Sequence, residues 1–272
     1  MTRRSALPGF GPALTITLVW VSLIVLLPLT SLAVRPWELG LMGVWHSITE
    51  PRVLAALRLS FGAAALAAVV NVPFGLLVAW VMVRYRFPGR RLADSLIDMP
   101  LALPTAVAGI ALTALFAPKG WIGAWLLPLG IKVAYTPVGI MVALVFVGLP
   151  FVVRTLEPVL MDLPLEAEEA AATLGATRAQ TLRKVVIPAL APALLAGFAA
   201  ALARGVGEYG SVIFIAGNMP MLSEIAPLLI VIRLEQLDYA GAAALGLVML
   251  LVSFSILLLL NLLQKRMGVK IR

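Results

Sequence analysis

Long apolar segments follow one another along the chain, and the short stretches between them carry most of the charged residues. A helix needs about 20 residues to cross the roughly 30 Å hydrocarbon core of a bilayer. Six apolar segments reach this length, which favours helix over strand. They cover residues 12–34, 58–83, 97–117, 134–153, 188–207 and 240–263. The pattern therefore predicts an all-α integral membrane bundle of six transmembrane helices.

The first segment has a second interpretation, as a cleaved signal peptide. It follows Arg3 and Arg4, and Ser31-Leu32-Ala33 is similar to a cleavage site. Its apolar part, from Leu14 to Leu32, is longer than the roughly 7–15 apolar residues of a signal peptide. We therefore expect a retained first helix over 12–34, preceded by an N-terminal stretch over 1–11.

Composition supports the membrane assignment and argues against other classes. The chain is 62% hydrophobic and 12% charged, whereas soluble domains average about 25% charged residues. The net charge of +8 does not indicate nucleic-acid binding, because the basic residues flank the apolar segments. With no cysteine and one histidine, His46, a thiolate or histidine metal site is not expected.

Lys and Arg are distributed unevenly between alternate connections. The N-terminus has two, and the loop after the second segment, the loop after the fourth and the tail have four each. The opposite connections have six in all, and Arg204 lies at the edge of the fifth segment. Cytoplasmic loops are the ones enriched in basic residues. Both termini, the loop over 163–187 and the tail over 264–272 are therefore expected in the cytoplasm.

The most polar long insert is the loop before the fifth segment. It contains the sequence Glu169-Ala-Ala-Ala-Thr-Leu-Gly175 and ends in Val185-Val-Ile-Pro188. Acidic residues come first and basic residues last, which suits a helix dipole. Gly175 is expected to end this short helix in the left-handed conformation, and Pro188 fits the first turn of the next helix. An ordinary amphipathic helix on the membrane surface is one interpretation of this stretch.

The spacing favours a more specific interpretation. Glu169-Ala170-Ala171, a glycine six residues after the glutamate, and the closing proline resemble the EAA loop of ATP-binding-cassette (ABC) importer permeases. Val185 and Ile187 stand where Ile and Leu are usual. The resemblance implies the type-I ABC importer permease fold over 57–263 and a coupling helix that docks into an ATPase subunit. The residues it implies for coupling are Glu168, Glu169, Ala170, Ala171, Gly175 and Pro188.

Two further places carry unusual residues at membrane depth. Pro100 and Pro104 are expected to bend the third helix, either as a simple kink or toward a cavity. Arg204 and Glu208 are four residues apart and should share a helix face near Gly207. They either neutralise each other at the end of the span or line a translocation path, where Arg204 would attract an anion.

The stretch over 211–239 is too broken for a seventh span and too apolar for a free loop, so we expect a short helix packed at the outer surface. From Gly207 to Ala240 the sequence resembles the T-type permease subunits of sulfate/thiosulfate ABC importers, and the resemblance extends over about 50–263. It matches the molybdate and W-type permeases less well. We expect Gly217, Asn218 and Glu224 to contact an external partner.

The resemblance implies ATP-driven import of sulfate or thiosulfate across the bacterial inner membrane. The implied partners are a W-type permease, two CysA-like ABC ATPase subunits and an external binding protein, besides membrane lipid. The chain has no phosphate-binding Gly-x-x-x-x-Gly-Lys-Ser/Thr motif, so we expect no enzyme activity and no bound cofactor. The alternatives are a molybdate or tungstate ABC permease and an ion-gradient-driven secondary transporter, which would show inverted repeats.

Overall fold

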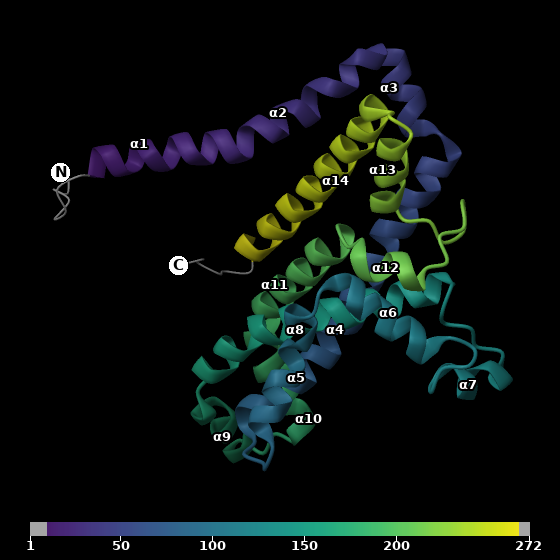
Figure 1. Cartoon of the computed structure of the whole chain (residues 1–272). Coiled ribbons are helices and arrows are strands. Elements are labelled where there is room, and N and C mark those ends of the chain that lie inside the picture. Colours follow the sequence, from purple (N-terminus) through teal and green to yellow (C-terminus); the bar gives the residue numbers. More distant parts are fainter. Residues whose placement is uncertain (1–9, 267–272) are drawn as a thin grey trace.

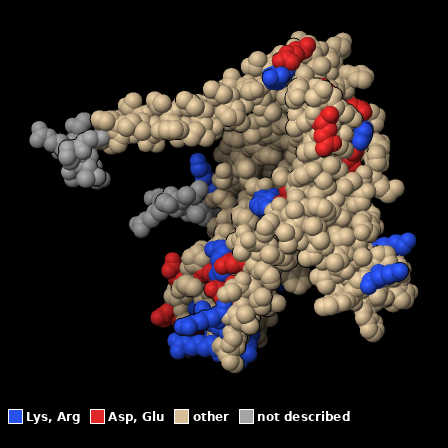
Figure 2. Space-filling view, viewed as in Figure 1, with Lys and Arg blue, Asp and Glu red and all other residues tan. Residues whose placement is uncertain are grey.

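The computed structural model describes residues 10–266, and all regular structure within that range is helical. Five helical segments are long and apolar enough to cross a membrane, and a bent pair makes a sixth. Most charged side chains gather toward the ends of the molecule, and few lie on the broad tan region between them (Figure 2). The predicted all-α membrane bundle is confirmed. Arg3, Arg4, Lys270 and Arg272 lie outside the described residues.

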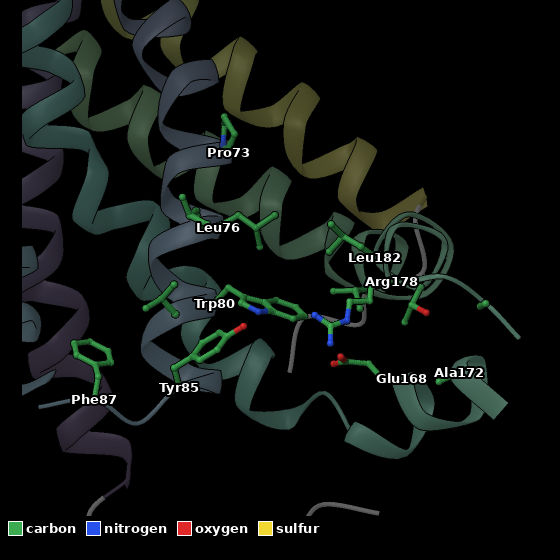
Figure 3. A pocket seen from close by; sticks show the side chains of 14 residues that line it. Pro73, Leu76, Trp80, Tyr85, Phe87, Glu168, Ala172, Arg178 and Leu182 are labelled. Atoms are coloured by element: carbon green, nitrogen blue, oxygen red, sulfur yellow. The ribbon is translucent and has the colours of Figure 1, made fainter. Parts of the chain in front are cut away.

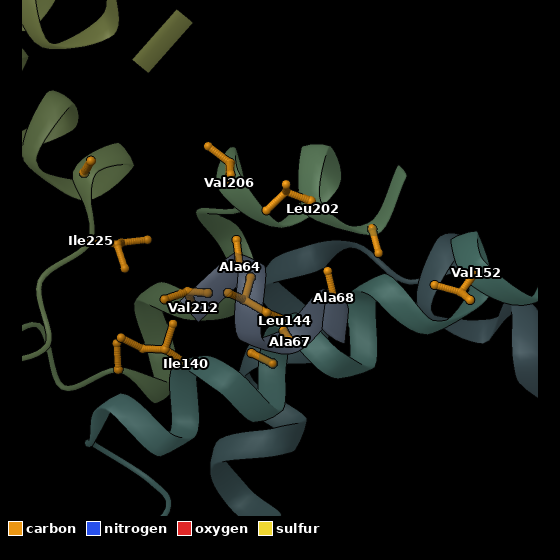
Figure 4. Close-up of a cluster of buried hydrophobic side chains, with 14 of the residues drawn as sticks. Ala64, Ala67, Ala68, Ile140, Leu144, Val152, Leu202, Val206, Val212 and Ile225 are labelled. Atoms are coloured by element: carbon orange, nitrogen blue, oxygen red, sulfur yellow. The ribbon is translucent and has the colours of Figure 1, made fainter. Parts of the chain in front are cut away.

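The centre of the molecule is a bundle of three long helices, α4, α8 and α11 (Figure 1). Small residues such as Ala64, Ala67 and Ala68 are buried where these helices meet (Figure 4). Small side chains let helix backbones approach closely, which is the usual way that helices associate in lipid. The bounds are Pro51–Arg84 for α4, Pro137–Asp162 for α8, Ile187–Val206 for α11 and Tyr239–Arg266 for the peripheral α14.

The third predicted span is two helices. α5 (Arg90–Ala102) and α6 (Thr105–Phe116) meet at an angle of 110°. Leu103 is extended, as expected for a residue that precedes proline, and Pro104 precedes the first residue of α6. Pro100 lies inside α5, which continues past it. The chain then passes through the short α7 (Gly123–Leu126) and a 3-10 turn (Leu127–Leu129) into α8.

The N-terminal helices extend away from the bundle (Figure 1). α1 (Phe10–Val21), a π-helical turn (Ser22–Leu26) and α2 (Leu27–Val34) have no buried residue. A 3-10 turn (Arg35–Leu39) and α3 (Gly40–Thr49) bring the chain to α4, and both contact α14. The helical run Phe10–Thr49 is thus longer than the predicted 12–34 segment.

The stretch before the last span contains two short helices where one was expected. α12 (Gly210–Ile215) packs on α6, and α13 (Ala226–Glu235) packs on α14. Neither is long enough to cross a membrane, as expected. The loop between α8 and α11 contains α9 (Leu165–Thr173), α10 (Arg178–Thr181) and a π-helical turn (Leu182–Val186).

Candidate functional site

The candidate site is the loop that contains α9 and α10. α9 ends in the turn expected at Gly175, which has a φ of +81°. The Gly175 amide donates to the Ala172 carbonyl at 3.0 Å, and the Ala176 amide donates to the Ala171 carbonyl at 3.0 Å. This pair of hydrogen bonds is the Schellman arrangement that closes helices at a left-handed residue. A Cβ at Gly175 would have no atom within 4 Å, so the backbone conformation alone favours glycine here.

Glu168 and Glu169, which are both predicted to act in coupling, have different surroundings in the structure. Glu168 is half-buried and pairs with Arg84 at 2.9 Å, at the C-terminal end of α4. The same guanidinium donates to the Leu163 carbonyl at 3.2 Å and lies 5.6 Å from the Trp80 ring centre. Glu169 is exposed and forms no ion pair within the described part of the chain. Glu168 therefore fixes α9 to α4, and Glu169 remains accessible.

The accessible side of the turn is unusually apolar. Leu174, next to Gly175, is 87% exposed, and Ala170 is exposed as well. Leu174 is therefore free to contact another protein from a turn of fixed backbone conformation. The arrangement contains no reacting groups, and it can transmit a displacement of α9 to α4 through Arg84.

Pro188 lies in the first turn of α11, as expected, but the helical run that contains α11 does not begin there. The helix begins at Arg178, ten residues earlier, and runs continuously to Val206. Thr177 starts it with a capping box, in which the Thr177 hydroxyl accepts from the Gln180 amide and the Gln180 side chain accepts from the Thr177 amide. Thr-x-x-Gln is the sequence signal from which this start could have been predicted.

A π-helical turn accommodates Pro188 within this continuous helix. Proline has no amide proton and its ring clashes with the carbonyl four residues earlier, here that of Lys184. The turn Leu182–Val186 widens the helix just before that point, and the Ile187 amide donates to the Leu182 carbonyl, five residues back. The proline therefore lies in the first turn of α11, directly after a widened turn of the same helical run.

At the other end of α11, Arg204 and Glu208 form the expected ion pair. The Glu208 side chain is buried, and its Oε1 accepts from the Ser211 amide at 2.9 Å and from the Ser211 hydroxyl at 2.8 Å. The carboxylate thus caps the start of α12. Gly207 is exposed and has open space beside it. Pairing and capping are present, and a role of Arg204, Gly207 and Glu208 in a translocation path stays a prediction, as it does for Pro100 and Pro104.

The three residues expected to contact an external partner differ in accessibility. Gly217 is exposed, with a φ of +75°, and Asn218 donates from its side chain to the Ile213 carbonyl at 2.8 Å. Glu224 is 2% exposed and accepts two hydrogen bonds from Arg52, at 2.7 and 2.8 Å. A direct partner contact through Glu224 would require this pair to open.

A cluster centred on Arg154 of α8 was not predicted from the sequence. Its guanidinium pairs with Asp98 at 2.6 Å, Glu157 at 2.7 Å and Asp94 at 2.8 Å. Asp94 and Asp98 come from α5, so the cluster joins α5 to α8. The spacing of four residues between the two aspartates was a usable signal for one helix face, but nothing local pointed to Arg154.

Comparison with known proteins agrees with this architecture. The family described as binding-protein-dependent transport system inner membrane component matches residues 71–269. A sulfate transport system permease protein CysT from Salmonella typhimurium is 48% identical over 98% of this chain and 97% of its own length. The protein of the same name from Synechococcus elongatus is 48% identical over 91% of this chain and 89% of its own length.

Solved structures show the same fold at low identity. A chain of a bacterial alginate ABC transporter in complex with a periplasmic protein matches with a TM-score of 0.77 and 16% identity, over 94% of this chain and 93% of that one. The MetNI methionine ABC transporter matches with a TM-score of 0.52 and 20% identity, over 80% and 96%. The six-span architecture, the loop around Gly175 and these matches lead to one conclusion: the chain belongs to the family of inner membrane components of binding-protein-dependent transport systems.

Proposed function

We propose that this chain is the permease subunit of an ATP-driven importer of sulfate and thiosulfate in a bacterial inner membrane. The proposed substrate rests on the 48% identity to two sulfate permeases, which extends over most of each chain. The observation that supports ATP coupling is the rigid turn at Gly175, with Leu174 and Glu169 exposed beside it. Sulfate and thiosulfate are similar in charge and shape, so one pathway can serve both.

The proposed complex contains a W-type permease, two ABC ATPase subunits and an external binding protein. ATP binding closes the ATPase dimer and displaces α9, which is the coupling helix of this proposal. Arg84 passes the displacement to α4 because it binds both Glu168 and the Leu163 carbonyl. The pathway then opens outward and receives the anion from the binding protein.

The direct test is uptake of labelled sulfate by cells that lack their own sulfate permease and carry this chain with its proposed partners. ATP-dependent uptake that thiosulfate inhibits is the expected result. Uptake of molybdate alone would mean that the substrate is molybdate, and it would leave the ABC importer assignment unchanged. Uptake that persists without the ATPase subunit would contradict the ABC mechanism and favour an ion-gradient-driven transporter.

Coupling is tested by Gly175→Val. The left-handed conformation costs a residue other than glycine about 1–2 kcal/mol, and the cost is higher for a β-branched residue. We expect sulfate uptake to fall roughly tenfold while ATP hydrolysis by the complex continues, since about 1.4 kcal/mol corresponds to a factor of ten. The control is Thr173→Val, which places the same side chain on the exposed end of α9 with a helical backbone. Equal uptake by both variants would show that glycine at position 175 is not required for coupling.

A further inference from the structure

A groove of about 1090 Å³ lies between the C-terminal half of α4 and the loop helices (Figure 3). One wall is the apolar face of α4, and the other is built by α9, α10 and the π-helical turn. It contains residues that flank the Gly175 turn on both sides, Ala172 and Ala176. The groove therefore adjoins the candidate coupling site without including Leu174 or Glu169.

The α4 wall is both apolar and open. Leu76, Leu77 and Val81 line it, and Leu77 is 60% exposed. From Pro73 to Trp80 this wall extends about 10 Å along the helix, at about 1.5 Å per residue. Large aliphatic side chains exposed on a membrane-spanning helix face acyl chains or another protein. The chemistry of the wall suits an acyl chain, and its length covers part of one.

Aromatic side chains stand where the groove reaches the end of α4. Trp80, Tyr85 and Phe87 line this part, and Tyr85 is 57% exposed (Figure 3). Trp and Tyr are enriched at the boundary between hydrocarbon and headgroups, where one edge of the ring is apolar and the other is wet. The groove thus passes from an apolar section into an interfacial one.

The loop wall supplies the charge. Arg178 extends from α10 into the groove, between Trp80 and Glu168 (Figure 3). It forms no ion pair with an acidic side chain within residues 10–266, and Glu168 is already paired with Arg84 at 2.9 Å. Two guanidinium groups and one carboxylate leave this end of the groove positive by one charge. An anionic group near Arg178 would neutralise this positive charge.

We propose that the groove binds an anionic phospholipid, with an acyl chain along Leu76, Leu77 and Val81 and the phosphate at Arg178. Arginine binds phosphate through two parallel N–H donors. The Thr181 side chain, on the same helix, also lines the groove; its hydroxyl donates to the Thr177 carbonyl at 3.3 Å and would exchange this bond for one to the headgroup. The bound lipid touches Ala172 and Ala176, and so stabilises the turn between α9 and α10. This consequence for transport rests on the proposed function, whereas the binding itself does not.

The test is lipid retention by the purified full complex in detergent, measured by native mass spectrometry. Phosphatidylglycerol and phosphatidylcholine with the same acyl chains are added separately. We expect phosphatidylglycerol to be retained preferentially, and Arg178→Gln to weaken its apparent affinity about tenfold, the loss typical of a charge-assisted contact. Arg183→Gln is the matched control, because Arg183 is exposed on the same helical run and does not line the groove.

Ala172→Phe gives a second variant, which narrows the groove from the loop wall toward α4. We expect it to lower retention of both lipids, and glycerol 3-phosphate to leave retention unchanged, because the acyl chain is part of the ligand. Equal retention of the two lipids, or equal effects of Arg178→Gln and Arg183→Gln, would overturn the proposal. So would a disulfide cross-link between Leu77→Cys and a cysteine introduced into the partner permease, because a protein segment would then occupy the groove. None of these readouts needs ATP or sulfate, so they are independent of the uptake test.

Discussion

At the scale of single residues, three buried carboxylates of this chain are held by named partners. Glu208 caps α12 at Ser211 and is paired with Arg204, Glu157 is paired with Arg154, and Glu224 is paired with Arg52. An ionised carboxylate removed from water costs several kcal/mol unless such partners are present. The Arg204–Glu208 and Arg52–Glu224 pairs therefore also fix a helix end or loop, whereas Arg154 and Glu157 both lie within α8.

The Arg52–Glu224 pair predicts an asymmetric effect of mutation. Glu224 has 2% of its side chain exposed and Arg52 has 34%. Arg52→Met leaves a buried carboxylate without a partner and should destabilise the protein by about 3 kcal/mol, at the lower end for a broken buried pair. Glu224→Gln leaves a cation that can reach water and should cost less than about 1.5 kcal/mol. Thermal unfolding of the purified protein compares the two.

The double variant Arg52→Met with Glu224→Gln provides the control for this prediction. It should recover part of the loss, since no unpaired charge remains buried. If the two single variants were equally stable, the burial of Glu224 would not be the cause.

The sequence predicted residues whose roles depend on their immediate neighbours. Gly175 was placed correctly in a left-handed turn because helix termination is a local property. The Arg204–Glu208 pair was also found, because four residues on a helix are one turn apart. The pairing of Arg84 with Glu168 could not be predicted, because 84 residues separate the two and either could bind another charge.

At the scale of elements, glycines decide how closely the helices approach. A Cβ at Gly109 of α6 would lie 2.4 Å from the Ser211 carbonyl oxygen of α12. A Cβ at Gly75 of α4 would lie 2.6 Å from Val152 of α8. The first contact is with backbone, which cannot rotate away, and the second is with a side chain. The α6–α12 contact is therefore the less tolerant of the two.

Alanine substitutions at two glycines test the packing argument. Gly109→Ala should destabilise the protein by about 1–3 kcal/mol, the usual cost of overpacking. Gly62→Ala on α4 meets no atom within 4 Å and should be neutral or stabilising by up to about 1 kcal/mol, because alanine has the higher helix propensity. The measurement is the midpoint of thermal unfolding. A loss of stability in Gly62→Ala equal to that in Gly109→Ala would refute the packing argument.

Element positions were well predicted where length and hydropathy decide them, and less well where proline does. The six apolar segments all fall largely in helices. Pro100 and Pro104 looked equivalent in sequence, but the helix ends only before Pro104, and Pro188 sits inside a helix behind a π-helical turn. A proline can lie within a helix or end it. Which of the two occurs depends on the hydrogen-bond partner that the freed carbonyl finds in the folded protein, and this partner cannot be deduced from the local sequence.

At the scale of the whole molecule, the orientation in the membrane is predicted from the uneven distribution of Lys and Arg between alternate connections, and it stays a prediction. The cytoplasmic loop is expected to contain Leu174, and the opposite side to contain Leu129. Both side chains are well exposed, at 87% and 72%. They therefore give accessible positions on the two predicted sides.

Single cysteines test this orientation, because the natural chain has none. Leu129→Cys in intact cells should react with a membrane-impermeant maleimide. Leu174→Cys should react only after the membrane is opened. The reverse pattern would place the Gly175 turn outside the cell, beyond the reach of an ATPase, and would end the proposed function.

The sequence did not predict how the N-terminal helices leave the bundle. Hydropathy identifies a segment that must lie in lipid or against protein, but not which of the two. No residue of α1 is buried by the rest of the chain, whereas α2 packs on α14 without a fully buried residue, so contacts within the chain fix the position of α2 only.

The bend between α5 and α6 has a mechanical consequence. The Arg154 cluster attaches α5 to the C-terminal half of α8, whereas Gly109 and Gly210 let α6 and α12 pack closely together. The two halves of the third span are thus held by different contacts and joined by the extended backbone at Leu103, although both also pack on α8. A displacement of the α5 half can be absorbed there as a rotation, and the α6 half need not follow. The third span is therefore a single crossing made of two separately anchored helices, and the backbone at Leu103 is the place where the angle between them can change.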